Sequence, residues 1–390
     1  MRKIIIKLIA AFILDKQKRK AFRKKYLWRD HGISCFAKYD FPREIHKKDI
    51  GLVGLWGNVN YGSVLTNFAT YKFIKDYGKS VLLIERPINS IEVPYVGNIF
   101  HTIPYPPSDV SPQYNTIDEM CELNQAADTF IVNSDILYGE YSVRVFSQFM
   151  LLDYIDNSKN KYAYAASFGF DKFLGTEDLR KKEETSLHNF KKFTVREKSG
   201  IDVAKNYFNI SSELVLDPLF LCNIRHFKSL AKNGKALLQG GIGCYILDTI
   251  EHDGLKIVDD VSQHLNLQNC VISDYQNPKN RIKNVRIEDW LATYFASDFI
   301  ITDSFHGTCM AIILKKPFIT IANVRRGLTR FESILELAGL RDHLVFDFEE
   351  YVQKRDMLLN TPIDWSAVSY NMRDTLNHSK EILRNMINSK

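Results

Sequence analysis

The sequence predicts an α/β protein made of two consecutive units, each built on a parallel sheet. Short apolar runs alternate with helical patterns along most of the chain. A strand, a Gly-rich turn, a helix and a second strand follow one another over residues 51–85, and the alternation restarts after a polar stretch at 222–235. This order is typical of parallel sheets. With 390 residues, 45% of them hydrophobic, the chain can bury the cores of two or three domains.

Residues 1–48 form the first predicted segment, and its apolar part is too short to cross a membrane. Residues 4–14 are apolar except for Lys7, whereas a bilayer span needs about 20 residues. The apolar part runs directly into KQKRKAFRKK, without the small-residue cleavage site of a signal peptide. Eleven Lys or Arg against Asp15 give residues 1–29 a net charge of +10.

As a helix, the apolar part of this segment is amphipathic. Lys3 and Lys7 fall on one side, and the other side carries Ile5, Leu8, Ile9, Phe12 and Ile13. Such a helix can lie in a membrane interface, where each following basic residue contributes about 1 kcal/mol against anionic head groups. The alternative is a basic helix that packs on the folded protein.

Residues 49–225 form the predicted first unit. The strand at 51–56 leads through GNVNYGS into a helical pattern that Gly78 closes. The remaining strands of this unit are predicted at 80–85, 129–133, 161–168, 193–197 and 214–218, with helical segments between several of them.

Residues 226–350 form the predicted second unit, after a junction in the polar stretch at 222–235. Strands are expected within 236–247 and 269–274, and at 298–302 and 317–322. Helices are expected at 254–265, around 288–297 and after His306. Residues 351–390 form a last segment, helical from about Trp365 to Ile387, which can pack back across the junction.

Charge and cysteine content exclude several classes of protein. The total charge is +6, so the chain beyond residue 29 carries −4, and no nucleic-acid-binding surface is expected. The six cysteines are scattered, without a CxxC pair or a Cys/His cluster of zinc spacing. We therefore expect no disulfide framework, no metal and no cofactor, and a reducing, cytoplasmic compartment.

The segment TDSFHGT, residues 302–308, joins a predicted strand to a predicted helix. In open α/β sheets, ligands bind beyond the carboxyl ends of strands, where helix N-termini favour anions. Asp303 or Ser304 can cap the helix, and Ser304, Gly307 and Thr308 are candidates for contact with a bound phosphate or carboxylate. A histidine at this place can exchange a proton near neutral pH. The alternative for His306 is a structural role near the cap.

Arginines at two further strand ends are candidates for the same anion. Arg326 and Arg330 lie in the loop and helix start after the strand at 317–322, and Arg196 ends the strand at 193–197. Guanidinium groups bind phosphate and carboxylate in a bidentate manner. Surface arginines are common, so each residue alone is a weak signal.

The turn GNVNYGS and the pair Ser134-Asp135 are candidates for the other side of a cleft. Two glycines and two asparagines between a strand and a helix fit a close approach of backbone to ligand, or a tight structural turn. The spacing matches neither a GxGxxG fingerprint nor a Walker motif. The candidate acceptor or cleft residues are Asn58, Tyr61, Gly62, Asn67 and Asp135.

Taken in order, these segments resemble the bacterial polysaccharide pyruvyl transferase family. The resemblance covers roughly residues 50–340 and rests on GNVNYGSVLTNFATYKFIKDYG, FIVNSD, YAYAASFG, FTVREKSG, LVLDP, EDWLATYFASDFIITDSFHGTCMAIILKKPFITIAN and RGLTRF. It implies two Rossmann-like domains that face a cleft, as in the GT-B arrangement of glycosyltransferases. It also implies transfer of pyruvate from phosphoenolpyruvate to a sugar or lipid-linked oligosaccharide as a cyclic ketal.

By this resemblance, His306 is the active-site histidine and Arg196 the arginine associated with phosphoenolpyruvate. Arg326 stands where relatives carry a basic donor-binding residue, and Arg330 is a second choice. The segment after Asn133 departs from the family, since Ile136, Leu137 and Tyr138 replace Gln, Val and Trp. If that loop contacts the acceptor, the acceptor differs.

Two other functions stay open. A GT-B glycosyltransferase would use a nucleotide sugar and would need an acidic residue for it in the second unit. Glu288 and Asp289 are available, but they fit better as the first turn of a helix. A non-catalytic saccharide-binding protein of a membrane assembly complex is the second alternative. A lipid-linked acceptor would agree with peripheral contact of the chain with the cytoplasmic face of the membrane.

Overall fold

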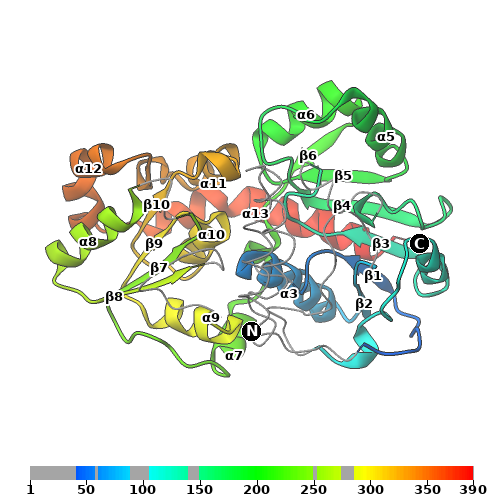
Figure 1. Ribbon diagram of the computed structural model, residues 1–390, viewed down its shortest axis with the longest axis horizontal. Helices are drawn as coiled ribbons and strands as arrows, with labels where there is room; N and C mark the ends of the chain where they lie inside the picture. The colour runs from blue at the N-terminus through cyan, green and yellow to red at the C-terminus, as the bar shows by residue number, and fades with distance from the viewer. Residues whose placement is uncertain are drawn as a thin grey trace, which may run out of the picture.

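The computed structural model describes residues 41–57, 60–87, 105–138, 149–248, 253–273 and 285–389. The amphipathic helix predicted near the N-terminus lies outside these ranges. Two parallel sheets lie side by side in Figure 1, each accompanied by helices. The α/β fold class predicted from the alternating pattern is therefore confirmed.

The first sheet has six parallel strands in the order β2-β1-β3-β4-β5-β6. Its strands are β1 (Ile50–Val53), β2 (Val81–Ile84), β3 (Thr129–Val132), β4 (Asn160–Ala166), β5 (Lys192–Val195) and β6 (Ser212–Leu214). The accompanying helices are α3 (Tyr61–Asp76), α5 (Glu177–Leu187) and α6 (Lys198–Phe208), with the 3-10 helices η3 (Pro107–Asp109), η4 (Asp118–Gln125) and η5 (Pro218–Leu221).

The second sheet has five parallel strands in the order β11-β10-β9-β7-β8. Its strands are β7 (Ile242–Ile246), β8 (Asn269–Ser273), β9 (Phe299–Thr302), β10 (Phe318–Ile321) and β11 (Leu344–Val345). Its helices are α8 (Gly254–Leu265), α9 (Ile287–Ala296), α10 (Phe305–Ile313), α11 (Thr329–Ala338) and α12 (Phe348–Asn360), with the short η6 (Val324–Arg326) and η7 (Arg341–His343).

The helix α3 is buried on nearly all sides, as its sequence indicates. Asn60 caps its first turn by accepting hydrogen bonds from the amides of Gly62 and Ser63. The predicted closing residue, Gly78, follows the helix with a φ of 75°, a conformation that glycine adopts without strain. The helix starts at Tyr61, three residues before the apolar pattern that predicted it, because the Asn60 cap fixes its beginning.

Two helices connect the halves of the molecule. The stretch 222–235, expected to be a polar junction, contains α7 (Ile224–Ala231), because Phe227 and Leu230 share one face and are buried. The predicted terminal helix is α13 (Trp365–Ile387). It runs across both units in Figure 1 and contacts α11 of the second unit and β3 of the first.

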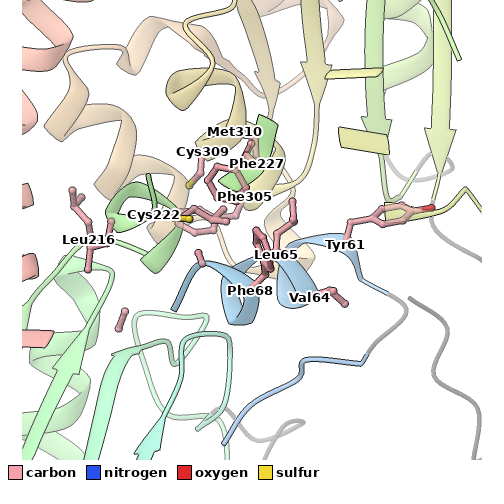
Figure 2. Close-up of a cluster of buried hydrophobic side chains, with 14 of the residues drawn as sticks. Tyr61, Val64, Leu65, Phe68, Leu216, Cys222, Phe227, Phe305, Cys309 and Met310 are labelled. Atoms are coloured by element: carbon pink, nitrogen blue, oxygen red, sulfur yellow. The ribbon is translucent and has the colours of Figure 1, made fainter. Parts of the chain in front are cut away.

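An apolar core joins the two units at the helices α3 and α10. Figure 2 shows side chains of α3, among them Leu65 and Phe68, meeting Phe305, Cys309 and Met310 of α10, with Phe227 of α7 beside them. These side chains are all buried. The N-termini of the two facing helices are thereby held together, and the functional site forms around them.

Candidate functional site

A pocket of about 330 Å³ lies where carboxyl ends of strands from both sheets meet. Most of its residues directly follow strands β3, β4, β7, β9 and β10, the place where parallel sheets bind ligands. The lining residues are Asn60, Asp135, Ile136, Phe168, Phe170, Lys172, Leu174, Leu247, Ser304, Phe305, His306, Arg325, Arg326 and Arg330. Five basic or imidazole side chains face a single carboxylate, so the pocket suits an anion.

His306 lies in the first turn of α10 and lines this pocket. Ser304 is the cap of α10 and accepts a hydrogen bond from the amide of Gly307, which settles the cap expected at Asp303 or Ser304. The His306 side chain is only 4% exposed. Its ring packs against Gly62 of α3, where any Cβ would overlap Nδ1 and Cγ. The ring is therefore clamped between the two helix N-termini.

The Nε2 atom of His306 faces charged groups of the first unit. Nη1 of Arg196 lies 3.1 Å from it, and Oδ2 of Asp217 lies 3.5 Å from it. A guanidinium has only donors, so a neutral ring accepts from Arg196 at Nε2 and carries its own proton on Nδ1.

Arg196 is placed differently from the expectation that it binds the donor directly. Its side chain is completely buried, is absent from the pocket lining and already pairs with two carboxylates. Nη1 donates to Asp217 at 2.7 Å, and Nη2 donates to Asp135 at 3.2 Å. Burial lowers the pKa of Arg196, but the two carboxylates outweigh burial and raise it. Arg196 therefore organises the site from behind His306.

Arg330 is the buried arginine that faces the pocket. It is 6% exposed and pairs with no carboxylate among the described residues. Its Nε and Nη2 donate to the backbone oxygens of Gly327 and Arg326 at 3.3 and 2.7 Å. Burial, and then the charge of Arg196, lower the pKa of Arg330 to about 10, so it stays charged at neutral pH. A buried charge without a partner is costly, so an anion bound beside Arg330 would be stabilised.

Arg326 also lines the pocket, but a carboxylate holds it. Its Nε and Nη2 donate to Asp248 at 2.6 and 3.2 Å, and 30% of its side chain is exposed. Asn323 and Asp303 support this pair, because the Asn323 amide donates to both Asp248 and Asp303. Arg326 was expected before Arg330 as the donor-binding residue. In the structure Arg326 already has a carboxylate partner, whereas Arg330 has none among the described residues.

Asp135 is the carboxylate of the pocket. Its Oδ1 accepts from the amide of Ile136 at 2.8 Å, and Oδ2 accepts a short hydrogen bond from Ser63. Burial alone would raise the pKa of Asp135, but the charges of Arg196 and His306 and the Ser63 hydrogen bond hold it below its usual value.

Several residues predicted from the same motifs lie elsewhere. Tyr61 is buried against Trp290, with ring centroids 5.5 Å apart, and donates to Val285 O at 2.6 Å. The side-chain amide of Asn67 lies against Gly54. Gly307 packs on Thr302 and Tyr294, and Thr308 bonds to Ser304 O and Thr320. None of these four lines the pocket. Asn58 lies outside the described residues.

The structure adds residues to the candidates chosen from the sequence. Asp217 and Ser134, which lie in the motifs LVLDP and Ser134-Asp135, surround Arg196. The pocket lining also contains Lys172 and the apolar residues Ile136, Phe168, Phe170, Leu174 and Leu247. The only available signal was that these residues follow strands.

In the described part of the chain, no group of three or more His, Cys, Asp or Glu side chains is arranged to hold a metal ion. No helix of the described ranges is long and apolar enough to span a bilayer.

Solved structures with this arrangement include the wall teichoic acid polymerase TagF. Two structures of TagF superpose with TM-scores of 0.51, at 12% and 11% identity. They cover 88% and 94% of this chain and 90% and 93% of their own. A UDP-N-acetylglucosamine 2-epimerase from Rickettsia bellii gives 0.48 at 11% identity, with 88% and 99% covered. The TagF likeness supports two Rossmann-like domains in a GT-B-like arrangement.

The family comparison concerns the sequence itself. No curated protein matches it significantly. The family model described as polysaccharide pyruvyl transferase matches residues 60–324, more than half of the chain. The match includes the pocket residues from Asn60 to His306 and ends just before Arg325, Arg326 and Arg330. The chain therefore belongs to the polysaccharide pyruvyl transferase family.

Proposed function

We propose that this protein transfers the pyruvate group of phosphoenolpyruvate to two hydroxyls of a sugar. The product is a cyclic ketal, and inorganic phosphate is released. The acceptor is a galactose-type residue of a surface polysaccharide or of its lipid-linked precursor. The observation that carries the proposal is Arg330, a buried guanidinium that faces a pocket beside His306 and pairs with no carboxylate among the described residues.

The pocket is lined by both basic and apolar side chains. Arg330 and Arg326 provide positive charge for the carboxylate and phosphate of phosphoenolpyruvate. Phe168, Phe170 and Leu174 provide an apolar surface, on which the C–H face of a sugar ring can pack. This combination of side chains supports an anionic donor and an uncharged acceptor ring in one pocket.

His306 supplies and recovers a proton in this scheme. As an imidazolium it protonates C3 of phosphoenolpyruvate, which makes C2 electrophilic. The first sugar hydroxyl bonds to C2 and gives its proton to the now neutral ring. The C2–O bond to phosphate then breaks, and phosphate leaves with the electron pair. The second hydroxyl bonds to C2, and its proton goes to the departing phosphate. Arg330 stabilises the negative charge throughout.

The experiment uses the full chain with phosphoenolpyruvate and galactose-containing acceptors. We expect phosphate release that depends on acceptor, together with a new ketal methyl signal in the proton NMR spectrum of the product. His306→Ala should abolish both while the circular dichroism spectrum stays unchanged. Retention of near-normal turnover by His306→Ala would refute the role of the ring.

A parallel reaction contains nucleotide sugars instead of phosphoenolpyruvate. The GT-B-like fold makes glycosyl transfer the alternative activity. In the structure, Glu288 and Asp289 lie in the first turn of α9, and neither lines the pocket. Glycosyl transfer without any use of phosphoenolpyruvate would overturn the proposed donor, and saccharide binding without either reaction would favour a non-catalytic protein.

We also propose peripheral contact with the cytoplasmic face of the cytoplasmic membrane, where a lipid-linked acceptor would reside. The support is the net charge of +10 on residues 1–29, because basic residues bind anionic head groups. Removal of residues 1–29 should abolish sedimentation with vesicles that contain anionic lipid. Equal sedimentation of the truncated and full chains would contradict this contact.

A further inference from the structure

Asp217 lies at the point where three strand ends and α3 approach His306. It follows β6, and its side chain is completely buried. It also caps η5, because its Oδ1 accepts a hydrogen bond from the amide of Leu219 at 3.1 Å. The same Oδ1 accepts from Thr66 of α3 at 3.2 Å. Oδ2 accepts from Arg196 at 2.7 Å and from Ser134 at 3.1 Å.

We propose that Asp217 is a positioning residue that holds Nε2 of His306 and so directs proton exchange to Nδ1. The inference rests on the proposed function, in which His306 moves the proton. Asp217 is not expected to touch the donor or the acceptor, because it does not line the pocket. It acts through the imidazole ring and through Arg196.

Nη1 of Arg196 has fewer hydrogens than nearby acceptors. This nitrogen carries two hydrogens, but three acceptors lie within reach. They are Oδ2 of Asp217 at 2.7 Å, Oγ of Ser134 at 3.0 Å and Nε2 of His306 at 3.1 Å. The hydrogen not bound to Asp217 therefore has two alternative acceptors, the serine hydroxyl and the ring.

The protonation state of the His306 ring decides which of these two acceptors Arg196 uses. When the ring is neutral, Arg196 donates to Nε2. When the ring is protonated, Nε2–H donates toward Oδ2 of Asp217, which is 3.5 Å away, and Arg196 turns its hydrogen to Ser134. Nε2 is thus bound by the protein in both states. The proton that reaches the substrate has to pass through Nδ1, the ring nitrogen beside Gly62.

Charges on the neighbouring elements act on the ring in opposite directions. Arg196 after β5 and Arg330 of α11 favour the neutral ring, whereas Asp217 and Asp135 favour the imidazolium. Burial would raise the pKa of Asp217, but the hydrogen bond and charge of His306, together with Arg196, hold it well below its usual range. These contacts favour the anionic form of Asp217.

The test is the substitution Asp217→Asn, which keeps the shape of the side chain and removes its charge. In protein labelled with ¹⁵N-histidine, the titration midpoint of His306 should fall by about one pH unit or more. The signals of His306 are assigned by their loss in His306→Asn. Because His306 has to be protonated to act on C3, the alkaline limb of the kcat profile should move to lower pH by the same amount, while KM for phosphoenolpyruvate changes little.

Thr66→Val is the matched control, because it removes a hydrogen bond from Oδ1 of Asp217 but leaves the charge and the Oδ2 contacts. The His306 midpoint should then stay close to that of the unaltered protein. A folded Asp217→Asn variant with an unshifted midpoint would overturn the proposal. If Asp217→Asn does not fold, Ser134→Ala decides, since it leaves Arg196 with Nε2 as its only alternative acceptor. Ser134→Ala should lower the titration midpoint of His306. An unchanged midpoint in this variant would overturn the proposal.

The spectroscopic readout separates this inference from the proposed function. A shifted midpoint in protein that does not consume phosphoenolpyruvate would leave Asp217 as the residue that holds the ring, and would refute the donor assignment. Normal pyruvate transfer with an unshifted midpoint would refute the role of Asp217 and leave the proposed function intact.

Discussion

Gly62 of α3 and His306 of α10 are in direct contact across the two halves of the protein. A Cβ at Gly62 would overlap Nδ1, Cγ and Cβ of the histidine, so the ring occupies the space that a side chain would fill. The two residues are far apart in the sequence, and the apolar core around Phe305 and Leu65 brings their helices together. The position of the ring thus depends on the absence of one methyl group.

The first prediction is that Gly62→Ala inactivates the enzyme without unfolding it. The added methyl group would overlap Nδ1 and must push the imidazole ring away from α3. A shift of about 1 Å in a catalytic group can cost 100-fold in rate. We expect kcat for phosphate release to fall by about 100-fold. Alanine also favours a helix over glycine by about 1 kcal/mol, which offsets part of the strain.

Gly78→Ala, at the other end of the same helix, is the control. Nothing lies within 4 Å of a Cβ at Gly78, but its φ is 75°, which costs a non-glycine residue about 1 kcal/mol. This variant should lose a little stability and keep its kcat. Equal activities of the two variants would show that the ring tolerates displacement.

The second prediction concerns Arg330, where stability and donor binding should change in opposite directions. Arg330→Met removes a buried charge that has no carboxylate partner among the described residues, so the melting temperature without ligand should rise. The same change removes the proposed partner of the donor anion. KM for phosphoenolpyruvate should increase by about 100-fold or more, which corresponds to about 3 kcal/mol.

Arg326→Met is the comparison for Arg330→Met. Arg326 pairs with Asp248 and is partly exposed, so its loss leaves a carboxylate without its partner and should not raise the melting temperature. If Arg330→Met is destabilised and binds phosphoenolpyruvate normally, Arg330 has a structural role and the donor site lies elsewhere.

The regular elements could be predicted from the sequence because their apolar patterns are local. The buried strands β3, β9 and β10 and the helix after His306 are each visible in a few consecutive residues. The stretch at 222–235 resembles a polar junction because its polar residues outnumber the apolar ones. Only two side chains of α7, Phe227 and Leu230, are buried, which is a weak signal for a helix of eight residues.

The contacts of the site could not be predicted in the same way, because they join distant parts of the chain. Asp217 follows a strand and precedes a proline, so it has the sequence signature of an ordinary turn. Its partners Ser134 and His306 are 83 and 89 positions away. The choice between Arg196 and Arg330 depended on which one finds carboxylates, and only the packed structure decides that.

The third prediction concerns the contact between Gly169 and Gly327. Gly327 has a φ of 91°, and a Cβ on it would overlap the carbonyl oxygen of Gly169 in the first unit. Gly327→Ala should therefore separate the two sides of the pocket. We expect higher KM values for both substrates and a lower melting temperature.

Gly339→Ala serves as its control, because Gly339 has a similar φ of 72° but meets only the side chain of Asn371. Both variants bear the same backbone strain, so the difference between them reports the contact between the units. If both variants have the same KM values, this contact does not shape the pocket.

The last prediction is a stability change with pH that originates at Glu183 of α5. This side chain is fully buried among apolar groups, and neither of its oxygens has a hydrogen-bond partner. Burial raises the pKa of Glu183 from its usual 4.5 to about 8. In the unfolded chain the carboxyl ionises near 4.5, so the contribution of Glu183 to stability is complete below that pH and is lost as the pH rises toward about 8.

Glu183→Leu should abolish this loss, because leucine fills an apolar site without a titratable group. Each unit between the two pKa values corresponds to about 1.4 kcal/mol, so the variant should gain a few kcal/mol relative to the unaltered protein between pH 5 and about pH 8. Urea unfolding of both proteins at several pH values measures this difference in the free energy of unfolding. Glu184→Gln, at a neighbour that pairs with Arg180, should leave the pH dependence unchanged. A Glu183→Leu variant with the same pH dependence as the unaltered protein would show that the buried carboxyl is not its source.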